Sequence, residues 1–171
     1  MKWEFKDGNW IHSTAIIHGN VIMGKGNIIY PYVVIGELGF IRGLHPIKYP
    51  GAQITIGDRN QIGAHVSIMA GEEGSRIGSD NLIMNYVNIG HDCVIGHNNE
   101  IGAGTVVCGY VTIGNNNKIK VSCALRNRIT IGDDNVLGMM SNVVCSIGSN
   151  IVVMGNPAKE HEHPNNQASL D

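Results

Sequence analysis

The chain has 171 residues, a formal net charge of −2 and 23 glycines, and only 5% of its residues are aromatic. This length suits a single domain that can bury a sizeable core. The near-neutral charge supplies no basic field, so we expect no nucleic-acid partner. No apolar run reaches the ~20 residues that a membrane span needs, so we also expect no membrane span.

The amino-terminal segment and the cysteines predict the same compartment. The first ten residues, MKWEFKDGNW, lack the apolar stretch of a secretory signal peptide. The cysteines show neither a CxxC spacing nor the density of a disulfide scaffold, and they are Cys93, Cys108, Cys123 and Cys145. We therefore expect reduced thiols and a cytoplasmic protein.

An aliphatic residue recurs every six positions through most of the chain. Before the first break the repeated positions are Ile11, Ile17, Met23, Ile29 and Ile35, and after a shift of frame they are Ile56, Ile62 and Ile68. From Ile77 to Val143 every sixth residue is Ile, Val or Leu. A helical period of about 3.6 residues would leave this frame within two repeats, so the pattern predicts short β-strands in a repeating coil with an aliphatic core.

Asparagine adds a longer period, because Asn81, Asn99, Asn117 and Asn135 follow one another at intervals of 18 residues. Three hexads per interval predict a triangular coil of three strands, with about seven coils stacked at a strand spacing of about 4.8 Å. We expect the asparagines to pair amide to amide inside the stack, as structural residues. We expect the glycines that follow many aliphatic residues to occupy corners that need positive φ.

Two segments interrupt the hexads, residues 37–53 (ELGFIRGLHPIKYPGAQ) and residues 71–76 (GEEGSR). A solenoid gathers its insertions on one face, which is often the binding face. A solvated loop that covers an end or an edge is an equal alternative for the longer segment. The two segments are therefore predicted to be loop insertions in one β-helix domain over residues 1–155.

The last part of the chain leaves the repeat and turns polar. We expect a short polar carboxy-terminal tail over residues 156–171. Its His161 and His163 could suggest a metal site, but mobile polar termini are far more common than such sites. The tail is therefore predicted to bind no metal.

The repeat resembles that of the left-handed β-helix acyltransferases, and the nearer group is the UDP-N-acetylglucosamine O-acyltransferases of the lipid A pathway. The segments that carry the resemblance are IHSTAIIHGNVIMGKGNIIYPYVVIG, KYPGAQITIGDRN, IGSDNLIMNYVNIGHDCVIG and GNPAK, within residues 11–157. The resemblance implies an all-β fold, a left-handed parallel β-helix, assembled as a homotrimer with active sites between subunits. It implies transfer of an acyl group from acyl carrier protein or CoA to a hydroxyl or amine of a nucleotide-linked sugar. Neither a metal nor a permanently bound cofactor is implied.

His91 matches the general base of that family, and Asp92 matches its carboxylate partner. A sugar hydroxyl must lose a proton as it attacks a thioester, and an imidazole can take that proton at neutral pH. A neighbouring carboxylate can fix the tautomer and stabilise the imidazolium. His97 occupies the same hexad place but lacks the aspartate neighbour. The alternative for His91 is an exposed histidine without a function.

Two further positions match family site residues. Gly109, in VVCGYVTIG, matches the position whose backbone N–H faces the oxyanion, and a glycine leaves room for the thioester. An ordinary corner glycine is the alternative. Lys48, in the long insertion, matches a lysine that contacts the substrate, and a solvated surface lysine is the alternative.

Other positions depart from the family pattern and leave the acyl chain and the sugar open. Asn88 stands where the family has a second histidine, and Arg126 with Asn127 replaces a His-Gln pair that contacts the ligand. Arg126 and Arg128 are expected on the same side of a strand, where they could bind phosphate, with a solvated edge as the alternative. Tyr110 is one of the few aromatic residues beside the predicted site. We predict that Lys48, Asn88, Tyr110, Arg126 and Asn127 contact the substrate.

The sequence leaves three alternatives to a lipid A enzyme: a small sugar acetyltransferase, a non-catalytic scaffold and a carbonic anhydrase. The chain ends soon after GNPAK, without the helical domain of the lipid A enzymes, which is more typical of small sugar acetyltransferases that use CoA. A non-catalytic scaffold that binds a sugar or a protein is an alternative that the lost histidines favour. A γ-class carbonic anhydrase would share the prism, but its HxxxxH zinc ligands are absent, since His91 and His97 are six residues apart.

Overall fold

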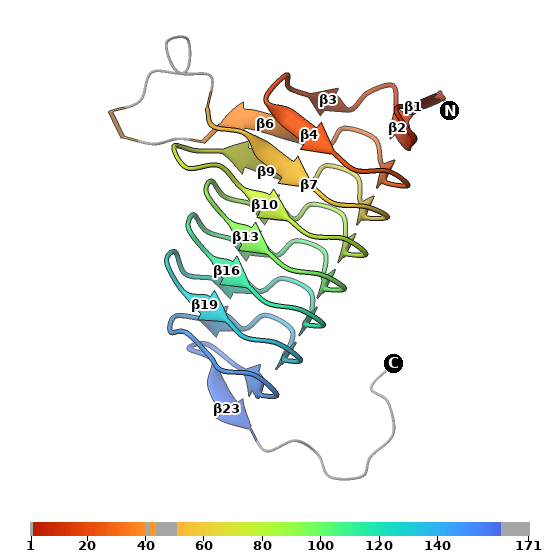
Figure 1. Cartoon of the computed structure of the whole chain (residues 1–171). Helices are drawn as coiled ribbons and strands as arrows, with labels where there is room; N and C mark the ends of the chain where they lie inside the picture. The colour runs from red at the N-terminus through yellow and green to blue at the C-terminus, as the bar shows by residue number, and fades with distance from the viewer. Residues whose placement is uncertain (1, 40–41, 44–50, 162–171) are drawn as a thin grey trace, which may run out of the picture.

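The computed structural model describes residues 2–39, 42–43 and 51–161, which wind into a left-handed parallel β-helix (Figure 1). The coils stack along one axis, with three flat sheets as the sides of a prism. Lys48 and His163 lie outside the described residues. No helix among the described residues is long and apolar enough to cross a bilayer.

Over the described residues the three sheets contain 23 strands. Sheet A consists of β1 (Trp3–Lys6), β2 (Asn9–His12), β5 (Ile28–Ile29), β8 (Gln61–Ile62), β11 (Leu82–Ile83), β14 (Glu100–Ile101), β17 (Lys118–Ile119), β20 (Val136–Leu137), β22 (Val152–Met154) and β23 (Lys159–His161). Sheet B consists of β3 (Ile16–Ile17), β6 (Val34–Leu38), β9 (Ser67–Ala70), β12 (Asn88–Ile89), β15 (Val106–Val107), β18 (Ala124–Leu125) and β21 (Asn142–Val143). Sheet C consists of β4 (Val21–Met23), β7 (Ile54–Ile56), β10 (Arg76–Ile77), β13 (Val94–Ile95), β16 (Thr112–Ile113) and β19 (Thr130–Ile131).

The hexad residues form the core, as the sequence predicted. Within the sheets, parallel strands pair residues that lie 18 positions apart, such as Ile77 with Ile95 and Ile95 with Ile113. Each strand of two residues points one side chain inward, and every hexad residue from Ile77 to Val143 is at most 3% exposed. This aliphatic column fills a prism that is too narrow for stacked rings.

The asparagine column is confirmed and is longer than the sequence suggested. The ladder consists of Asn9, Asn27, Asn60, Asn81, Asn99, Asn117 and Asn135, each at most 2% exposed. The Oδ1 of each asparagine accepts the backbone N–H of the next one at 2.8 to 3.0 Å. Because a buried amide without a partner is costly, the whole column must be asparagine.

The glycines of sheet C have a different role from the predicted one. Gly96 and Gly114 follow inward isoleucines, and neither has a positive φ. A Cβ on Gly96 would lie 2.5 Å from the carbonyl oxygen of Gly114 in the next coil, so close approach excludes a side chain. Positive φ occurs two residues later, at Asn98 and Asn116, because asparagine tolerates that conformation. The prediction of positive φ at these glycines was wrong.

Both ends of sheet A are closed by an antiparallel strand. β1 pairs with β2 at one end, and β23 pairs with β22 at the other. The segment predicted to be a polar tail from residue 156 therefore contributes a strand, whose three residues are all exposed. The sequence has no apolar alternation there, so only the open edge of β22 accounts for the pairing.

We predict that Asn99→Ala lowers the free energy of unfolding by about 2–4 kcal/mol, because it leaves the buried N–H groups of Asn117 without an acceptor. The matched control is Asn127→Ala at an exposed corner, with an expected change within about 0.5 kcal/mol. Urea unfolding followed by circular dichroism measures both. Equal midpoints for the two variants would contradict a structural ladder.

Candidate active site

The two interruptions of the hexads meet at one corner, between sheets B and C, which we call the B–C corner. The shorter one joins β9 to β10, one coil before the turn that carries His91. The stems of the longer one lie on the same corner, since the N–H of Gly39 donates to the carbonyl of Ala70 at 2.9 Å and that of Ala52 donates to the carbonyl of Gly71 at 2.7 Å. The irregular parts of the chain therefore gather around His91.

His91 and Asp92 form a direct hydrogen-bonded pair in the turn between β12 and β13. The Nδ1 of His91 lies 2.8 Å from Oδ2 of Asp92. The imidazole is 23% exposed, whereas the carboxylate is fully buried. An ionised Asp92 requires the proton on Nδ1, so the neutral ring carries its lone pair on the outer nitrogen, Nε2.

The shorter interruption holds the Asp92 carboxylate from the coil above. The backbone N–H groups of Glu73 and Gly74 donate to Oδ1 at 2.7 and 2.8 Å, and that of Glu72 donates to Oδ2 at 3.3 Å. Burial alone would raise the pKa of Asp92, but the hydrogen bond from His91 and these backbone donors outweigh it and hold the pKa below its usual value. Asp92 is therefore an ionised positioning group.

Gly109 lies directly beneath the imidazole. A Cβ at this position would stand 2.7 Å from Nε2 of His91, so any side chain would displace the ring. No hydrogen bond joins either Nε2 of His91 or the N–H of Gly109 to another described residue. Both groups are therefore free of described partners and close to each other, as a general base and an oxyanion donor must be.

Tyr110 and Arg128 continue the B–C corner below His91. The Tyr110 ring contacts the His91 ring edge to face, with centroids 5.0 Å apart, and the Arg128 guanidinium carbon lies 4.1 Å from the Tyr110 centroid. The pKa of Tyr110 is raised, mainly by burial and to a lesser extent by the negative charges of Asp92, Glu72 and Glu73. Its hydroxyl is therefore protonated at neutral pH and can donate a hydrogen bond.

The other predicted residues that the structure describes, Asn88, Arg126 and Asn127, lie around the same corner and share no hydrogen bond. Asn88, on β12, donates to Oγ of Ser67 at 2.6 Å, and Arg126 donates to the carbonyl of Val144 at 3.4 Å. Asn127 is exposed. The predicted strand through Arg126 and Arg128 is wrong, because β18 ends before Arg126 and Arg128 sits in the turn with φ of 63°.

The three backbone donors to Asp92 were not predicted from the sequence. Backbone groups carry no sequence signature of their own, but Gly71 and Gly74 flank the segment one coil above Asp92. A Cβ on Gly71 would collide with the Asp92 carboxylate, and Gly74 has φ of 89°. The available signal was one glycine on each side of Glu72 and Glu73, one coil before Asp92.

The described part of this corner holds one buried thiol and no cluster of metal ligands. Cys93 follows Asp92 but is buried, and burial raises the pKa of its thiol to about 11. All four cysteines are free thiols. Over residues 2–39, 42–43 and 51–161, no three His, Cys, Asp or Glu side chains gather as metal ligands.

Comparison with known proteins agrees with this fold. Residues 74–109 match the bacterial transferase hexapeptide family of six repeats. A UDP-N-acetylglucosamine acyltransferase from Bacteroides fragilis is similar with a TM-score of 0.85 and 25% identity, over 91% of this chain and 61% of that one. A UDP-N-acetylglucosamine acyltransferase from Francisella novicida reaches a TM-score of 0.77 at 20% identity, over 91% and 69%. A mutant perosamine N-acetyltransferase from Caulobacter crescentus, with CoA and GDP-perosamine, reaches 0.55 at 20%, over 91% and 57%.

The coil, the hexads and the family match define a hexapeptide-repeat protein of the left-handed β-helix class. Within this class the chain is similar in fold to the UDP-N-acetylglucosamine acyltransferase from Bacteroides fragilis. It spans 61% of the length of the Bacteroides protein.

We predict that Asp92→Asn is less stable than the unchanged protein at pH 7, and that the difference shrinks as the pH falls below about 4. The pKa of Asp92 is lower in the folded protein than in the unfolded chain. The carboxylate therefore stabilises the fold fully at pH values above its pKa in the unfolded chain, and this stabilisation is lost as the pH falls through its pKa in the folded protein. Urea midpoints from pH 7 to pH 3 measure this, with exposed Asp134→Asn as the control. A difference that stays constant with pH would contradict the prediction.

Proposed function

We propose that this protein is an acyltransferase that moves an acyl group from a phosphopantetheine thioester, acyl-ACP or acyl-CoA, to a hydroxyl or amine of a nucleotide-linked sugar such as UDP-N-acetylglucosamine. The observation that carries the proposal is the His91–Asp92 pair, with Nε2 of the ring against Gly109. The neighbouring acyltransferase structures support the general reaction class. The donor serves as a co-substrate rather than as a bound cofactor.

The reaction follows from the placement of these groups. The acceptor oxygen or nitrogen loses its proton to Nε2 of His91 as it bonds to the thioester carbonyl carbon. Negative charge then develops on the carbonyl oxygen, where the N–H of Gly109 can stabilise it. When the carbon–sulfur bond breaks, the imidazolium returns the proton to the departing thiolate. Asp92 keeps the ring oriented and stabilises its charged form.

Substrate contacts are assigned to the residues around His91. Arg126 and Arg128 bring positive charge to the B–C corner below His91, which suits the phosphates of a nucleotide or of a pantetheine arm. Tyr110 can donate a hydrogen bond from its hydroxyl, and Asn88 and Asn127 can bind sugar hydroxyls through their amides. Lys48, in the long insertion, is proposed as a further positive contact.

A homotrimer with sites between subunits is part of this proposal. The corner between sheets A and B, which we call the A–B corner, exposes several large apolar side chains: Tyr86 is 63% exposed, Met139 68% and Met140 74%. On this corner the ring of His65 stacks between those of Tyr32 and Tyr86, with ring centroids 4.9 Å and 4.8 Å apart. Such an exposed apolar strip is typical of a protein interface, and closed symmetric assembly is the usual outcome for identical chains.

We predict that His91→Ala lowers the rate of acyl transfer by about 100- to 10,000-fold, since it removes the general base. The assay offers acetyl-CoA, long-chain acyl-CoA and acyl-ACP against a panel of UDP- and dTDP-sugars. His161→Ala, an exposed histidine on β23, is the matched control and should retain the rate. Unchanged transfer by His91→Ala would refute the assignment, and no transfer with any pair would favour a scaffold.

We predict that light scattering gives three times the 18.4 kDa chain mass. Met140→Lys with Tyr86→Lys should shift the protein toward smaller species, because charges on the A–B corner would be buried unpaired. Lys25→Glu, on the corner between sheets C and A, is the control and should leave the mass unchanged. A monomeric mass for the unchanged protein would rule out the trimer.

A further inference from the structure

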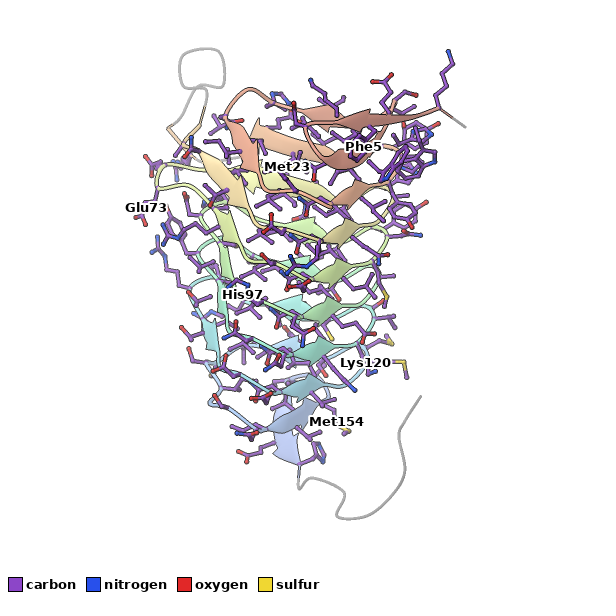
Figure 2. The ribbon with its side chains drawn as sticks, turned by 45° about the vertical axis from the view of Figure 1, so that its right-hand side comes forward. Phe5, Met23, Glu73, His97, Lys120 and Met154 are labelled. Carbon is purple, nitrogen blue, oxygen red and sulfur yellow. The ribbon has the colours of Figure 1, made fainter. Side chains whose placement is uncertain are left out.

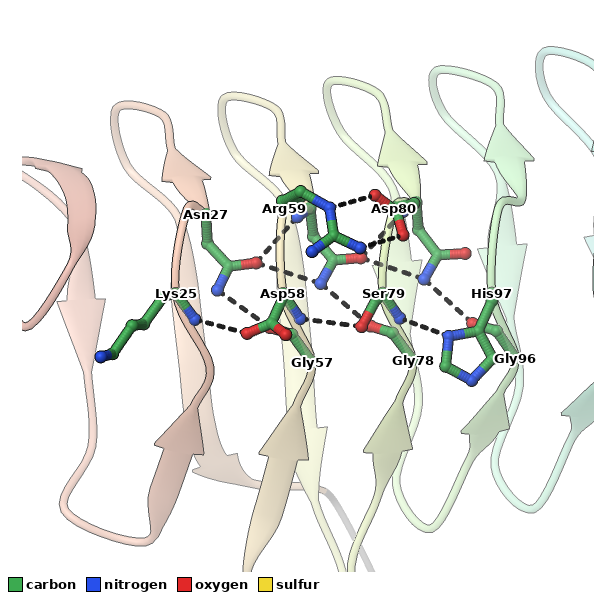
Figure 3. Close-up of polar contacts among 12 residues, drawn as sticks. Lys25, Asn27, Gly57, Asp58, Arg59, Gly78, Ser79, Asp80, Gly96 and His97 are labelled. Carbon is green, nitrogen blue, oxygen red and sulfur yellow. Dashed lines mark hydrogen bonds and ion pairs between the residues drawn. The ribbon is translucent and has the colours of Figure 1, made fainter.

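The polar side chains at the corner between sheets C and A each tie one turn to the equivalent turn of the coil before it (Figure 3). Oγ of Ser79 accepts the backbone N–H of Asp58 at 2.9 Å, and Nδ1 of His97 accepts that of Ser79 at 3.0 Å. Figure 2 shows His97 on this corner, apart from Glu73 on the B–C corner. At the B–C corner, Asn20 makes a connection of another kind.

Asn20 contacts both ends of the longer interruption. It lies in the first coil, in the turn between β3 and β4. We call residues 36–39 the first stem and residues 51–53 the second stem. The Nδ2 of Asn20 donates to the carbonyl of Gly36 at 3.1 Å and to the carbonyl of Ala52 at 3.2 Å. Because an amide nitrogen carries two hydrogens, one side chain ties the two stems together.

Glycines allow both stems to approach closely here. Gly36 has φ of 97°, and a Cβ on it would collide with Oδ1 of Asn20. Gly51 has φ of 84°, and a Cβ on it would lie 3.5 Å from Nδ2 of Asn20 and 2.7 Å from the Cβ of Ala70. A residue with a side chain would be strained at either place and would meet its neighbours, so the two glycines fit the stems to Asn20 and to the coil below.

The first stem leads from Asn20 to the imidazole of His91. β6 has a bulge between Ile35 and Leu38, where it uses one residue more than β9 before Leu38 pairs with Ala70. Bulges change the direction of a strand. The next residue, Gly39, is buried, and a Cβ on it would lie 3.3 Å from both Cβ and Cδ2 of His91. The first stem therefore packs directly on the His91 side chain.

The second stem leads from Asn20 to the carboxylate of Asp92. It lies against the shorter interruption, since a Cβ on Gly74 would collide with the carbonyl oxygen of Gln53 and lie 3.5 Å from the Cβ of Ala52. The N–H of Gly74 is one of the donors to Oδ1 of Asp92, at 2.8 Å. The second stem therefore supports the segment that holds Asp92.

We propose that Asn20 is a positioning residue for the His91–Asp92 pair and acts on it through the two stems. The inference rests on the proposed function, because it assigns Asn20 to the same general base. A base must present the lone pair of Nε2, which requires that Nδ1 keep its proton on Asp92. Packing of the first stem on the ring and of the second stem on the donors to Asp92 holds the two side chains in that arrangement. Asn20 itself lies three strands away from β12 along sheet B.

Kinetic constants separate positioning from substrate binding. Asn20→Ala should lower kcat by about 10-fold and leave KM nearly unchanged, because a displaced base weakens the transition state and not the bound substrate. Asn20→Asp keeps the size of the side chain but lacks the two N–H donors, so we expect the same loss. A raised KM with an unchanged kcat would make Asn20 a substrate contact and overturn the proposal.

Asn142→Ala is the matched control for these variants. Asn142 is also half-buried and also loses a side-chain hydrogen bond, to Oδ1 of Asn156 at 3.0 Å, but it lies on β21, three strands beyond β12 along sheet B. Both of its kinetic constants should stay unchanged. A loss of kcat equal to that of Asn20→Ala would reduce the effect of Asn20 to general destabilisation and contradict a positioning role.

Gly39→Ala tests the contact between the first stem and the ring. The added methyl group meets His91, so kcat should fall at least as far as in Asn20→Ala. Gly19→Ala, on the same corner, is the matched control, because a Cβ there has no atom within 4 Å and neither glycine has a positive φ. Equal rates for the two alanine variants would show that the first stem does not act on His91.

The protonation of the His91 ring tests the proposal without any substrate. Long-range proton–nitrogen NMR spectra at about pH 8, where an imidazole is neutral, report which ring nitrogen carries the proton, and His91→Ala identifies the signal. The proton should sit on Nδ1 in the unchanged protein and in the Gly19 and Asn142 variants, and should pass partly to Nε2 in Asn20→Ala and Gly39→Ala.

A proton that stays on Nδ1 in both Asn20→Ala and Gly39→Ala would overturn the positioning role, whether or not acyl transfer is found. A shifted proton in a protein that transfers no acyl group would support the positioning role and refute only the proposed function. Circular dichroism establishes that each variant is folded, and Asn20→Asp gives the same readout if Asn20→Ala does not fold.

Discussion

The vertical register between coils is the constraint on which the rest of this structure depends. Hydrogen bonds between parallel strands place each residue above the one 18 positions later, as with Ile83 and Ile101. A polar group inside the stack can reach only the equivalent group above or below it, so asparagine must recur at its position. Extra residues do not disturb this register. The ladder bond from Asn81 to Asn60 spans 21 positions, because three additional residues are accommodated at the B–C corner.

The same constraint explains where the candidate site lies. A stack of two-residue strands has no room for irregular backbone except at its corners, so both interruptions had to emerge there. Once they emerge on one corner, their backbone N–H groups become available to a buried carboxylate, and Asp92 is held by Glu73 and Gly74 from the coil above. The chain thus obtains a fixed imidazole from one turn of its repeat.

The sequence was sufficient for the fold because one inward residue in six carries nearly all of the pattern. His91 with Asp92 was singled out because this segment resembles the site of a known family and pairs an imidazole with a neighbouring carboxylate. Features that depend on the conformation of short segments were not predictable. Arg128 was placed on a strand because two-residue strands leave no alternation to measure. Gly96 was assigned to a turn although its constraint is the distance to the next coil. The donors to Asp92 are backbone atoms, which any residue except proline supplies.

The antiparallel strands at the two ends have a consequence for how the molecule behaves in bulk. A stack of parallel coils is a template for its own growth, since each end presents unpaired N–H and C=O groups at the spacing of a cross-β fibre. β1 and β23 reverse the strand direction, so another coil cannot continue the parallel ladder of sheet A beyond them. The exposed residues of β23, with a charged lysine and glutamate among them, further discourage pairing. β1 and β23 therefore oppose the end-to-end stacking of further coils on sheet A.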